Sequence, residues 1–245
     1  MKQIFLANLE SWGWTHHGTV REDNQDSFLN WPSHTLWAVA DGVGGGSNGA
    51  VASKMIISSL MNIPIPASFA EHLDSVRHSL NQVNIKLFAA AGGSSVTAST
   101  VVALLIYEDN VACLWAGDSR CYLLRGGVLY QCTSDHTLRQ QKIQTGDLTA
   151  PEANRMIQGN IITNAVGIDK ELKLEQVTFS LKAEDRFLLC SDGVSNLLSA
   201  EAILRHLSGN TAREAAFMIT ETLGNLPQPD NVTFVAVFIS GINNR

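Results

Sequence analysis

Four aspartates stand at the ends of apolar runs in a chain that carries only 16% charged residues. Asp41, Asp118 and Asp192 each follow such a run, and Asp230 comes shortly before the run Val232–Ile239. Taken singly, each acid would be assigned to a turn or a cap at the end of a buried strand. Carboxylate and carbonyl oxygens are, however, the ligands that hard divalent cations prefer. The recurrence of the pattern therefore predicts a shared site for a polyvalent cation.

Asp41 opens a glycine-rich loop, residues 41–49 (DGVGGGSNG), whose spacing fits three kinds of site. Gly44–Gly49 satisfies the G-x-G-x-x-G pattern of dinucleotide sites. That interpretation needs a following parallel strand, whereas the sequence predicts a second helix there, and the Asp41 carboxylate would repel a pyrophosphate. In the cation interpretation, Gly42 leaves its backbone carbonyl free to approach a metal.

The same loop contains G-x-S-x-G at Gly45–Gly49, with Ser47 as a candidate nucleophile. Its partners are poor, because His206 falls in an expected surface helix and His136 comes too early for the usual order of acid then base. A serine hydrolase is therefore the weaker alternative. One experiment separates the two interpretations. A serine hydrolase would lose its activity in Ser47→Ala, whereas a metal-dependent enzyme would lose it when the metal is removed.

The composition excludes several classes of protein. A net charge of −6 with no basic patch argues against nucleic-acid binding. The four cysteines form no C-x-x-C pair, which indicates small core residues in a reducing compartment. The N-terminus lacks a signal-peptide pattern, and no apolar run reaches the roughly 18 residues of a membrane span. We therefore expect a cytoplasmic protein with no membrane partner.

The order of the expected elements indicates the fold class. A helical apolar stripe predicts a helix at 69–87, with His72 and His78 off the stripe and solvated. Strands grouped in antiparallel runs and helices grouped in pairs predict an α+β fold. This fold is a four-layer α-β-β-α sandwich of two antiparallel sheets flanked by helices, as a single domain over residues 1–245. The other helices are expected at 50–61, 200–207 and 211–223. Strands are expected at 99–107, 111–116, 121–124 and 128–132 as one meander, and then at 174–181, 186–191 and 232–239. A polar insert at 133–163 carries two short helices over this scaffold.

Eight motifs, in order along nearly the whole chain, resemble the metal-dependent protein phosphatases of type 2C (the PPM family) in their compact bacterial form. They are Arg21–Ser27 (REDNQDS), Ala40–Gly45 (ADGVGG), Ala98–Thr100 (AST), Ala116–Arg120 (AGDSR), Thr133–Thr137 (TSDHT), Asn164–Gly167 (NAVG), Leu189–Val194 (LCSDGV) and Asp230–Thr233 (DNVT). The fold of that family is the same α-β-β-α sandwich, and its variable flap region corresponds to residues 133–163.

The resemblance implies a ligand set for metal ions. Asp41, Asp192 and Asp230 would bind two manganese or magnesium ions, with help from the Gly42 carbonyl. Asp118 together with Asp192 would form the weaker third metal site of bacterial members. Two such ions would lower the pKa of a bridging water, so that a hydroxide attacks phosphorus in line.

The resemblance also implies roles for residues beside the metals. Arg21 would hold the substrate phosphate through paired donors, and Asp26 would act through a metal-bound water. Asn231 would contact the metal-binding residues without binding a metal itself. Gln25 stands where many members have Glu, which removes one charge beside the metals. Val43 stands where some members have a His proposed to protonate the leaving group, so no general acid is named.

The implied function is a protein serine/threonine phosphatase that hydrolyses phosphoserine and phosphothreonine. We expect phosphorylated proteins and a cognate Hanks-type kinase as partners, and a monomer. The alternative is a pseudophosphatase, a phosphoprotein-binding regulatory module on the same fold. The complete set of Arg21, Asp41, Asp192 and Asp230 argues against that alternative, because a non-catalytic descendant has no need of it.

Overall fold

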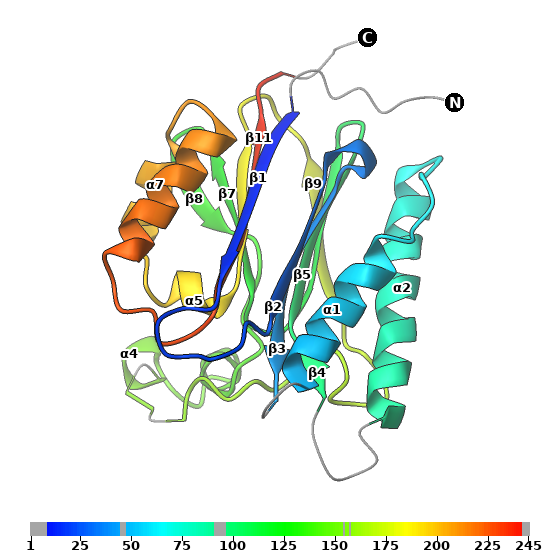
Figure 1. Cartoon of the computed structure of the whole chain (residues 1–245), viewed down its shortest axis with the longest axis vertical. Helices are drawn as coiled ribbons and strands as arrows, with labels where there is room; N and C mark the ends of the chain where they lie inside the picture. Colours follow the sequence, from blue (N-terminus) through cyan, green and yellow to red (C-terminus); the bar gives the residue numbers. More distant parts are fainter. Residues whose placement is uncertain (1–8, 45–47, 91–96, 154, 157, 242–245) are drawn as a thin grey trace.

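The computed structural model describes residues 9–44, 48–90, 97–153, 155–156 and 158–241, which form two antiparallel sheets (Figure 1). The first sheet has the order β1 (Leu9–His16), β11 (Val232–Ile239), β10 (Arg186–Cys190), β7 (Arg120–Arg125) and β8 (Val128–Gln131). The second has the order β2 (Asp26–Trp31), β3 (Leu36–Val43), β5 (Val101–Tyr107), β6 (Asn110–Ala116) and β9 (Glu175–Ser180), and the short β4 (Ala98–Ser99) pairs with β3.

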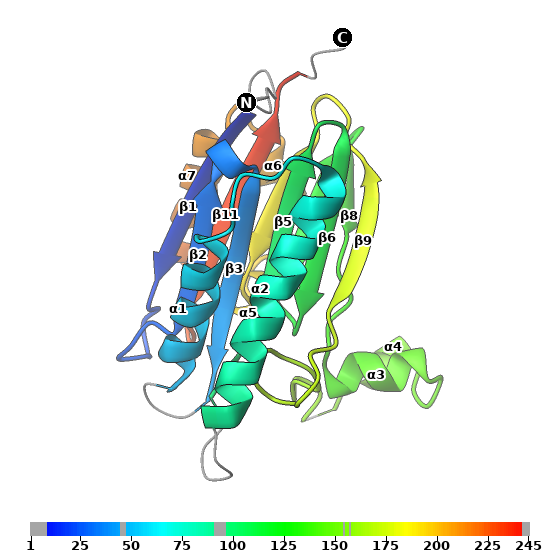
Figure 2. The same ribbon diagram turned by 90° about the vertical axis from the view of Figure 1, so that its right-hand side faces the viewer.

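Helices cover the outer face of each sheet, as Figures 1 and 2 show. Helices α1 (Asn48–Leu60) and α2 (Phe69–Ala90) cover the β2–β9 sheet, and α6 (Ala200–Leu207) and α7 (Ala212–Gly224) cover the β1–β8 sheet. Three apolar cores separate the four layers, one between the sheets and one beneath each helix pair. The expected α-β-β-α sandwich is confirmed, and the antiparallel pairing rules out the dinucleotide interpretation of the glycine loop.

Strand β3 shows why the central strands are apolar on both faces. Alternate residues of a strand point to opposite sides of a sheet. Leu36, Ala38 and Ala40 therefore belong to the core beneath α1 and α2, while Trp37 and Val39 belong to the core between the sheets. All five are fully buried, so neither side of the strand leaves room for a polar residue before Asp41.

The expected meander at 99–132 is split between the two sheets. β5 and β6 form a hairpin in one sheet, whereas β7 and β8 form a hairpin in the other. The chain crosses at residues 117–119, where Gly117 adopts φ +119° and packs against Thr100. Continuous apolar runs identify buried strands but carry no signal for the sheet that each strand joins. The crossing places Asp118 between the sheets.

Two histidines that were expected at the surface are buried instead. His72 of α2 is 1% exposed, and His206 of α6 is 4% exposed with its Nε2 bonded to Thr222 Oγ1 at 3.1 Å. The apolar positions of α2 predicted a narrower buried face than the helix has. They could not reveal His72, because a neutral imidazole can also be buried among apolar side chains. His78 is exposed as expected. All four cysteines are free, and Cys113, Cys121 and Cys190 are buried as expected.

The polar insert at 133–163 carries α3 (Leu138–Gln144) and α4 (Ala150–Ala153), which lie to one side of the sandwich near its lower end, at the lower right of Figure 2. A further turn of helix, α5 (Asp192–Ser195), follows β10 directly and was not expected.

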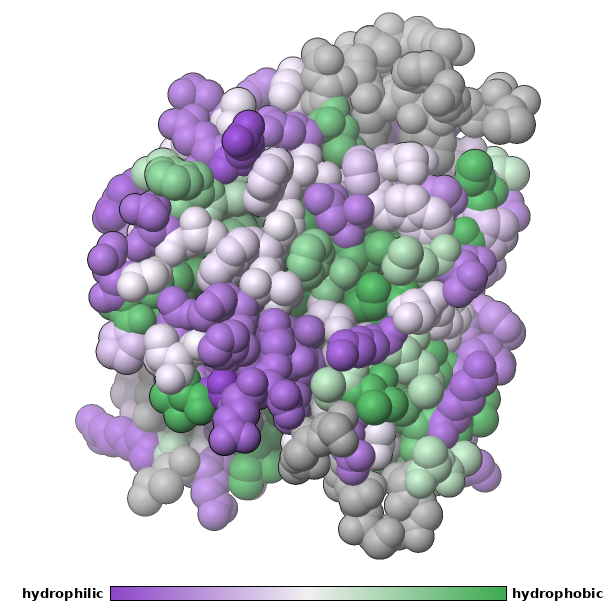
Figure 3. All heavy atoms as spheres, in the orientation of Figure 1, coloured by the Kyte–Doolittle hydropathy of each residue, from purple (hydrophilic) through white to green (hydrophobic). Residues whose placement is uncertain are grey.

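The most hydrophilic area on the face in Figure 3 lies over the β1–β2 connection, residues 17–25. Within the described ranges, no helix has the length and apolar character to cross a membrane.

Candidate metal centre

Five aspartates from both sheets meet at one end of the sandwich. Asp26 begins β2 and lies directly opposite Asp41 of β3. Asp118 lies in the crossing between β6 and β7, and Asp192 follows β10 at the start of α5. Asp230 comes two residues before β11. Strand ends from different sheets can share one site because the sheets are stacked with these ends together, so the grouping predicted from the sequence is present in the structure.

Hydrogen bonds across the gap between the sheets hold two of the acids in place. Ser191, at the end of β10, donates through Oγ to Asp26 Oδ2 on the other sheet at 2.8 Å. The Ser191 N–H donates to the Thr233 carbonyl at 2.9 Å, which ties the start of α5 to β11. Asp192, the next residue, is therefore fixed beside Asp26 rather than carried on a free loop.

Asn231 anchors the connection between β1 and β2. Its amide nitrogen donates to the carbonyls of His17 and Asp23, each at 2.9 Å, and its Oδ1 accepts from the Gln25 N–H at 2.8 Å. The Gln25 carbonyl in turn accepts from the Gly42 N–H at 3.2 Å. Asn231 thus supports the loop that carries Arg21 and the strand that carries Asp26, and its N–H also donates to Asp230 Oδ1 at 2.9 Å.

A second bridge connects Asp41 with the loop of Asp118. The Thr100 N–H donates to the Asp41 carbonyl at 2.8 Å, and Thr100 Oγ1 accepts from the Asp41 N–H at 3.1 Å. The same hydroxyl lies 2.7 Å from Ser119 Oγ, next to Asp118. Thr100 and Ser119 are buried, so this contact fixes the spacing between the two carboxylates. The family motif at Ala98–Thr100 therefore has a structural purpose.

Arg21 places a positively charged side chain at the edge of this group of acids. Its Nη2 lies 2.8 Å from Asp230 Oδ2, and both side chains are partly exposed, at 55% and 41%. The hydrogen bond to Asp230 is the main cause that raises the pKa of Arg21, and the charges of Asp41 and Asp192 add to it. Arg21 and Asp26 therefore both reach the acidic end of the sandwich, as the sequence predicted.

Burial and the charges of neighbouring acids raise the pKa values of four of these aspartates. Burial raises the pKa of Asp41 well above its ordinary value, and the charges of the other four acids add to the shift. Burial likewise raises the pKa of Asp26 to about 6 and that of Asp118 to about 7, and the charge of Asp192 adds to both shifts. Burial and Asp230 raise the pKa of Asp192. Carboxylates this close to one another disfavour the charged form unless a cation is present.

The oxygens of this group fit a hard cation. Asp26 Oδ1 and Asp118 Oδ1 are buried and accept no hydrogen bond from any described residue. Buried acceptors are normally satisfied, so each points to a partner that is not a protein donor. No three acidic, His or Cys side chains of the described chain are gathered closely enough to form a metal site by themselves. Mg²⁺ and related ions commonly take one or two carboxylates and complete their coordination with carbonyls and water.

Two glycines allow the backbone to pack tightly around the acids. A Cβ at Gly42 would collide with the backbone of Gly49, and one at Gly193 would collide with the Asn231 carbonyl. The glycine after Asp41 and the glycine after Asp192 are thus required by close approach of two backbone segments. The carbonyl role predicted for Gly42 remains a prediction.

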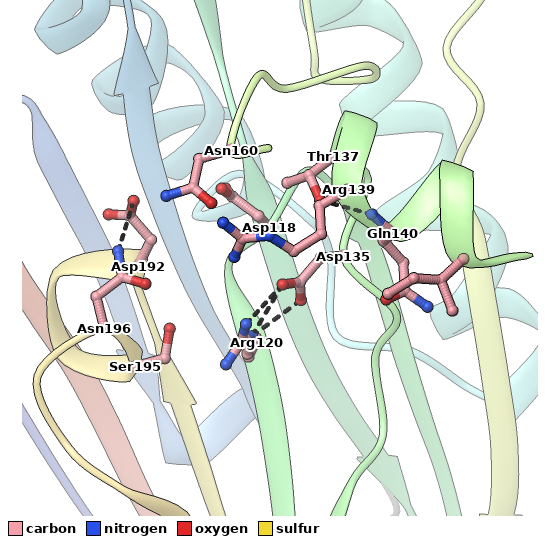
Figure 4. A pocket seen from close by; sticks show the side chains of 11 residues that line it. Asp118, Arg120, Asp135, Thr137, Arg139, Gln140, Asn160, Asp192, Ser195 and Asn196 are labelled. Carbon is pink, nitrogen blue, oxygen red and sulfur yellow. Dashed lines mark hydrogen bonds and ion pairs between the residues drawn. The ribbon is translucent and has the colours of Figure 1, made fainter. Parts of the chain in front are cut away.

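A cavity of about 170 Å³ adjoins the acids on the side of α3 (Figure 4). Asp118 and Asp192 line it together with residues of the polar insert. Arg120 and Asp135 form a bidentate pair in its wall, with N–O distances of 2.9 and 2.6 Å. Arg139 of the insert also lines the cavity and was not predicted from the sequence, because an isolated arginine in a polar stretch carries no spacing signal.

The serine-nucleophile interpretation finds no support in this arrangement. Ser47 lies outside the described residues. His136 accepts from the Gly117 N–H through Nδ1 at 3.1 Å, and its Nε2 lies 3.2 Å from Glu175 Oε1. His206 is engaged with Thr222 beneath the outer helices. Neither histidine is placed as a free base for a nucleophile.

Comparison with known proteins gives one consistent result. The sequence model of the family described as Protein phosphatase 2C matches residues 15–221. The serine/threonine phosphatase stp of Listeria monocytogenes is 29% identical over 236 residues, which cover 91% of this chain and 93% of that protein. PppA, described as a key regulatory component of T6SS in Pseudomonas aeruginosa, has a solved structure with a TM-score of 0.87 and 34% identity, covering 94% and 97% of the two chains. The catalytic domain of serine threonine protein phosphatase PstP, solved with two manganese ions, gives a TM-score of 0.83 and 30% identity, covering 95% and 99%.

The sandwich fold and the shared acidic end define a metal-dependent phosphatase. The chain belongs to the protein phosphatase 2C family, and it is a serine/threonine protein phosphatase. The family and the activity implied by the sequence motifs are thereby confirmed. The alternative of a non-catalytic, phosphoprotein-binding module is not supported, since the relatives are named as phosphatases.

Proposed function

We propose that the aspartate cluster is the catalytic centre and that it holds two Mn²⁺ or Mg²⁺ ions, with a third held more weakly. The observation that carries the proposal is the pair of buried carboxylate oxygens without protein donors among the described residues, Asp26 Oδ1 and Asp118 Oδ1, in a group of acids that together raise the pKa of Asp41. Asp41, Asp192 and Asp230 would bind the first two metal ions together with the Gly42 carbonyl. Asp118 and Asp192 would bind the third metal ion. When bound, such ions act as Lewis acids on the phosphoryl group and lower the pKa of a coordinated water.

Arg21 positions the phosphoryl group of the substrate. Its Nη2 is engaged with Asp230, and the exposed guanidinium can turn its other donors toward phosphate oxygens. Paired N–H donors in one plane match two phosphate oxygens and offset the charge that develops on them. Arg21 therefore orients phosphorus toward the acids, and Asp230 keeps the guanidinium at that edge.

Asp26 orients the attacking water. Its Oδ2 is fixed by Ser191, which leaves Oδ1 to receive a proton or a hydrogen bond at this point of the site. Burial raises the pKa of Asp26 to about 6 in the metal-free protein, and bound cations would lower it, so that the carboxylate would be ionised and able to accept a hydrogen bond from the water. Gln25, whose backbone is held by Asn231, and Asn231 itself keep Asp26 in register with Asp41.

The substrates and setting that we propose follow from the family. Phosphoserine and phosphothreonine proteins would be the substrates, and a Hanks-type kinase would supply them. One catalytic domain over residues 1–245, acting as a monomer, would suffice because all the acids come from one chain. The four free cysteines support a reducing, cytoplasmic location.

Hydrolysis of a phosphothreonine peptide by purified protein tests the proposal, with Mn²⁺, with Mg²⁺ and with excess EDTA. Asp192→Asn removes one charge from the proposed ligand set and should lower kcat by at least about 100-fold. Glu201→Gln, which neutralises an exposed acid on α6, is the matched control and should retain wild-type rates. Circular dichroism checks that both variants fold. Activity that is indifferent to EDTA would refute the metal centre, and equal rates in Asp192→Asn would refute the ligand assignment.

A further inference from the structure

The cavity beside the metal centre contains an arginine whose Nε has no acceptor among the described residues. Arg139 lies in the first turn of α3, and Figure 4 shows its side chain extending into the cavity on the side of Asp118. Its Nε is shielded from solvent, and no described residue accepts a hydrogen bond from it. A buried donor left without an acceptor is unfavourable by more than a hydrogen bond normally contributes. The position therefore fits an acceptor that arrives with a ligand.

The backbone of the insert holds this guanidinium in place. The Arg139 N–H donates to the Gly159 carbonyl at 2.9 Å, which joins α3 to the returning chain of the insert. Gly159 has no side chain, and a Cβ built there would lie 2.8 Å from Arg139 Nε and 2.9 Å from Nη2. The guanidinium thus packs directly against Gly159, where any side chain would displace it. Gly159 and Arg139 act as a matched pair that directs the positive charge into the cavity.

The other charged groups of the cavity wall are already engaged. Arg120 is bound to Asp135 through Nε and Nη2, so neither of these two residues is available to a ligand. Asp118 and Asp192 belong to the proposed metal set, whose cations would offset their charge. No ion pair joins Arg139 to a carboxylate anywhere in the described part of the chain. Its neighbours Gln140 and Asn160 are neutral amides that can also donate.

We propose that Arg139 is a specificity-determining residue, which binds an acidic side chain of the substrate next to the phosphorylated residue. This proposal rests on the proposed function. Asp192 belongs to both the metal centre and the cavity, so a peptide with its phosphate at the metals runs past the cavity mouth. An extended chain advances roughly 3.3–3.6 Å per residue, so the side chains that would lie over the cavity are those within a few residues of the phosphoresidue. Its carboxylate would supply the acceptor that Nε lacks, with charge assistance.

The test compares phosphothreonine peptides that differ at single flanking positions, Glu in one and Gln in the other. We expect the wild-type enzyme to favour Glu over Gln at one or two positions by about tenfold in kcat/KM. In Arg139→Gln that ratio should fall to about one, and Arg139→Lys should retain part of it, because an ammonium keeps the charge but loses the planar fork. The matched control is Lys142→Gln on the same helix, whose ammonium binds Asp147 in solvent, and this variant should keep the wild-type ratio.

A second variant separates position from charge. Gly159→Ala keeps Arg139 but places a methyl group against its guanidinium, so it should also reduce the ratio of Glu to Gln peptides. Loss of activity on both peptides to the same extent in Arg139→Gln would overturn the proposal, as would a wild-type ratio near one at every position. Failure of the proposed function gives a different result, namely no Mn²⁺-dependent hydrolysis of p-nitrophenyl phosphate or of any peptide by the wild-type protein.

Discussion

Asp26 and Asp41 lie directly opposite one another on adjacent antiparallel strands, so their carboxylates are held side by side at the end of the sandwich. Like charges directly opposite one another destabilise the pairing of β2 with β3. The fold tolerates the pair because Ser191, Thr100 and the surrounding backbone hold both acids by hydrogen bonds. The remaining repulsion is between the two carboxylates, and a bound cation would reduce it. This relationship determines how the protein should respond to protons and to metals.

The affinity for Mn²⁺ should rise with pH. Burial raises the pKa of Asp26 to about 6 and that of Asp118 to about 7 in the metal-free protein, so below these values protons occupy the proposed ligand Asp118 and the neighbouring Asp26. Binding then releases protons, and the apparent affinity increases as pH rises through this range. Isothermal titration calorimetry at about pH 5.5 and 7.5 should show binding at least roughly tenfold tighter at the higher pH. An affinity independent of pH would contradict the assignment.

Replacing Gly42 with alanine should damage both stability and activity. The added Cβ would collide with the backbone of Gly49, and neither segment can move without disturbing Asp41 or the start of α1. Overpacking of this kind typically costs about 1–3 kcal/mol. Gly224→Ala is the matched control, because nothing lies within 4 Å of a Cβ at the end of α7. Thermal unfolding and phosphatase assays should show losses only for Gly42→Ala, and equal behaviour of the two variants would show that the close approach is not required.

His72 should make the protein sensitive to acid. Burial, with a smaller contribution from His34, lowers the pKa of His72 to about 4 from 6.5, and neither ring nitrogen has a partner in the described residues. Between these pH values the unfolded chain binds a proton that the folded state excludes. His72 therefore contributes a loss of unfolding free energy as pH falls from about 6.5 to 4, of up to roughly 3 kcal/mol. In the metal-free protein the raised pKa values of Asp26 and Asp118 contribute in the opposite direction, so urea unfolding of the wild type must be compared with a variant at position 72.

The variant His72→Leu isolates this effect. A leucine fills the buried position without a titrating group, so the pH-dependent loss of unfolding free energy should shrink by most of that amount. His78→Gln, which replaces an exposed histidine of the same helix, should keep the wild-type dependence. If His72→Leu unfolds with an unchanged dependence on pH, another group is responsible for the acid sensitivity.

The sequence predicted the grouping of the acids and the layers better than the surroundings of individual residues. Apolar runs that end in aspartate report both a buried strand and the position of its end, so Asp41, Asp118 and Asp192 could be grouped with Asp230 from the sequence alone. The distribution of strands between the sheets could not be predicted, because β6 and β7 are equally apolar whichever sheet they join. The surroundings of His72 and Arg139 were not predicted for a common reason: residues distant in sequence create them, and a local pattern contains no record of such neighbours.

The two sheets contribute different members of the catalytic set: Asp26 and Asp41 come from one, and Asp192 and Asp230 from the other. At these strand ends, the bond from Ser191 to Asp26 joins one sheet to the other. Activity therefore depends on the mutual alignment of two independent layers, which is set by the large side chains between them, such as Trp37 and Phe187. Substitutions in that distant core would change turnover by sliding one half of the catalytic centre relative to the other, even where each half stays folded.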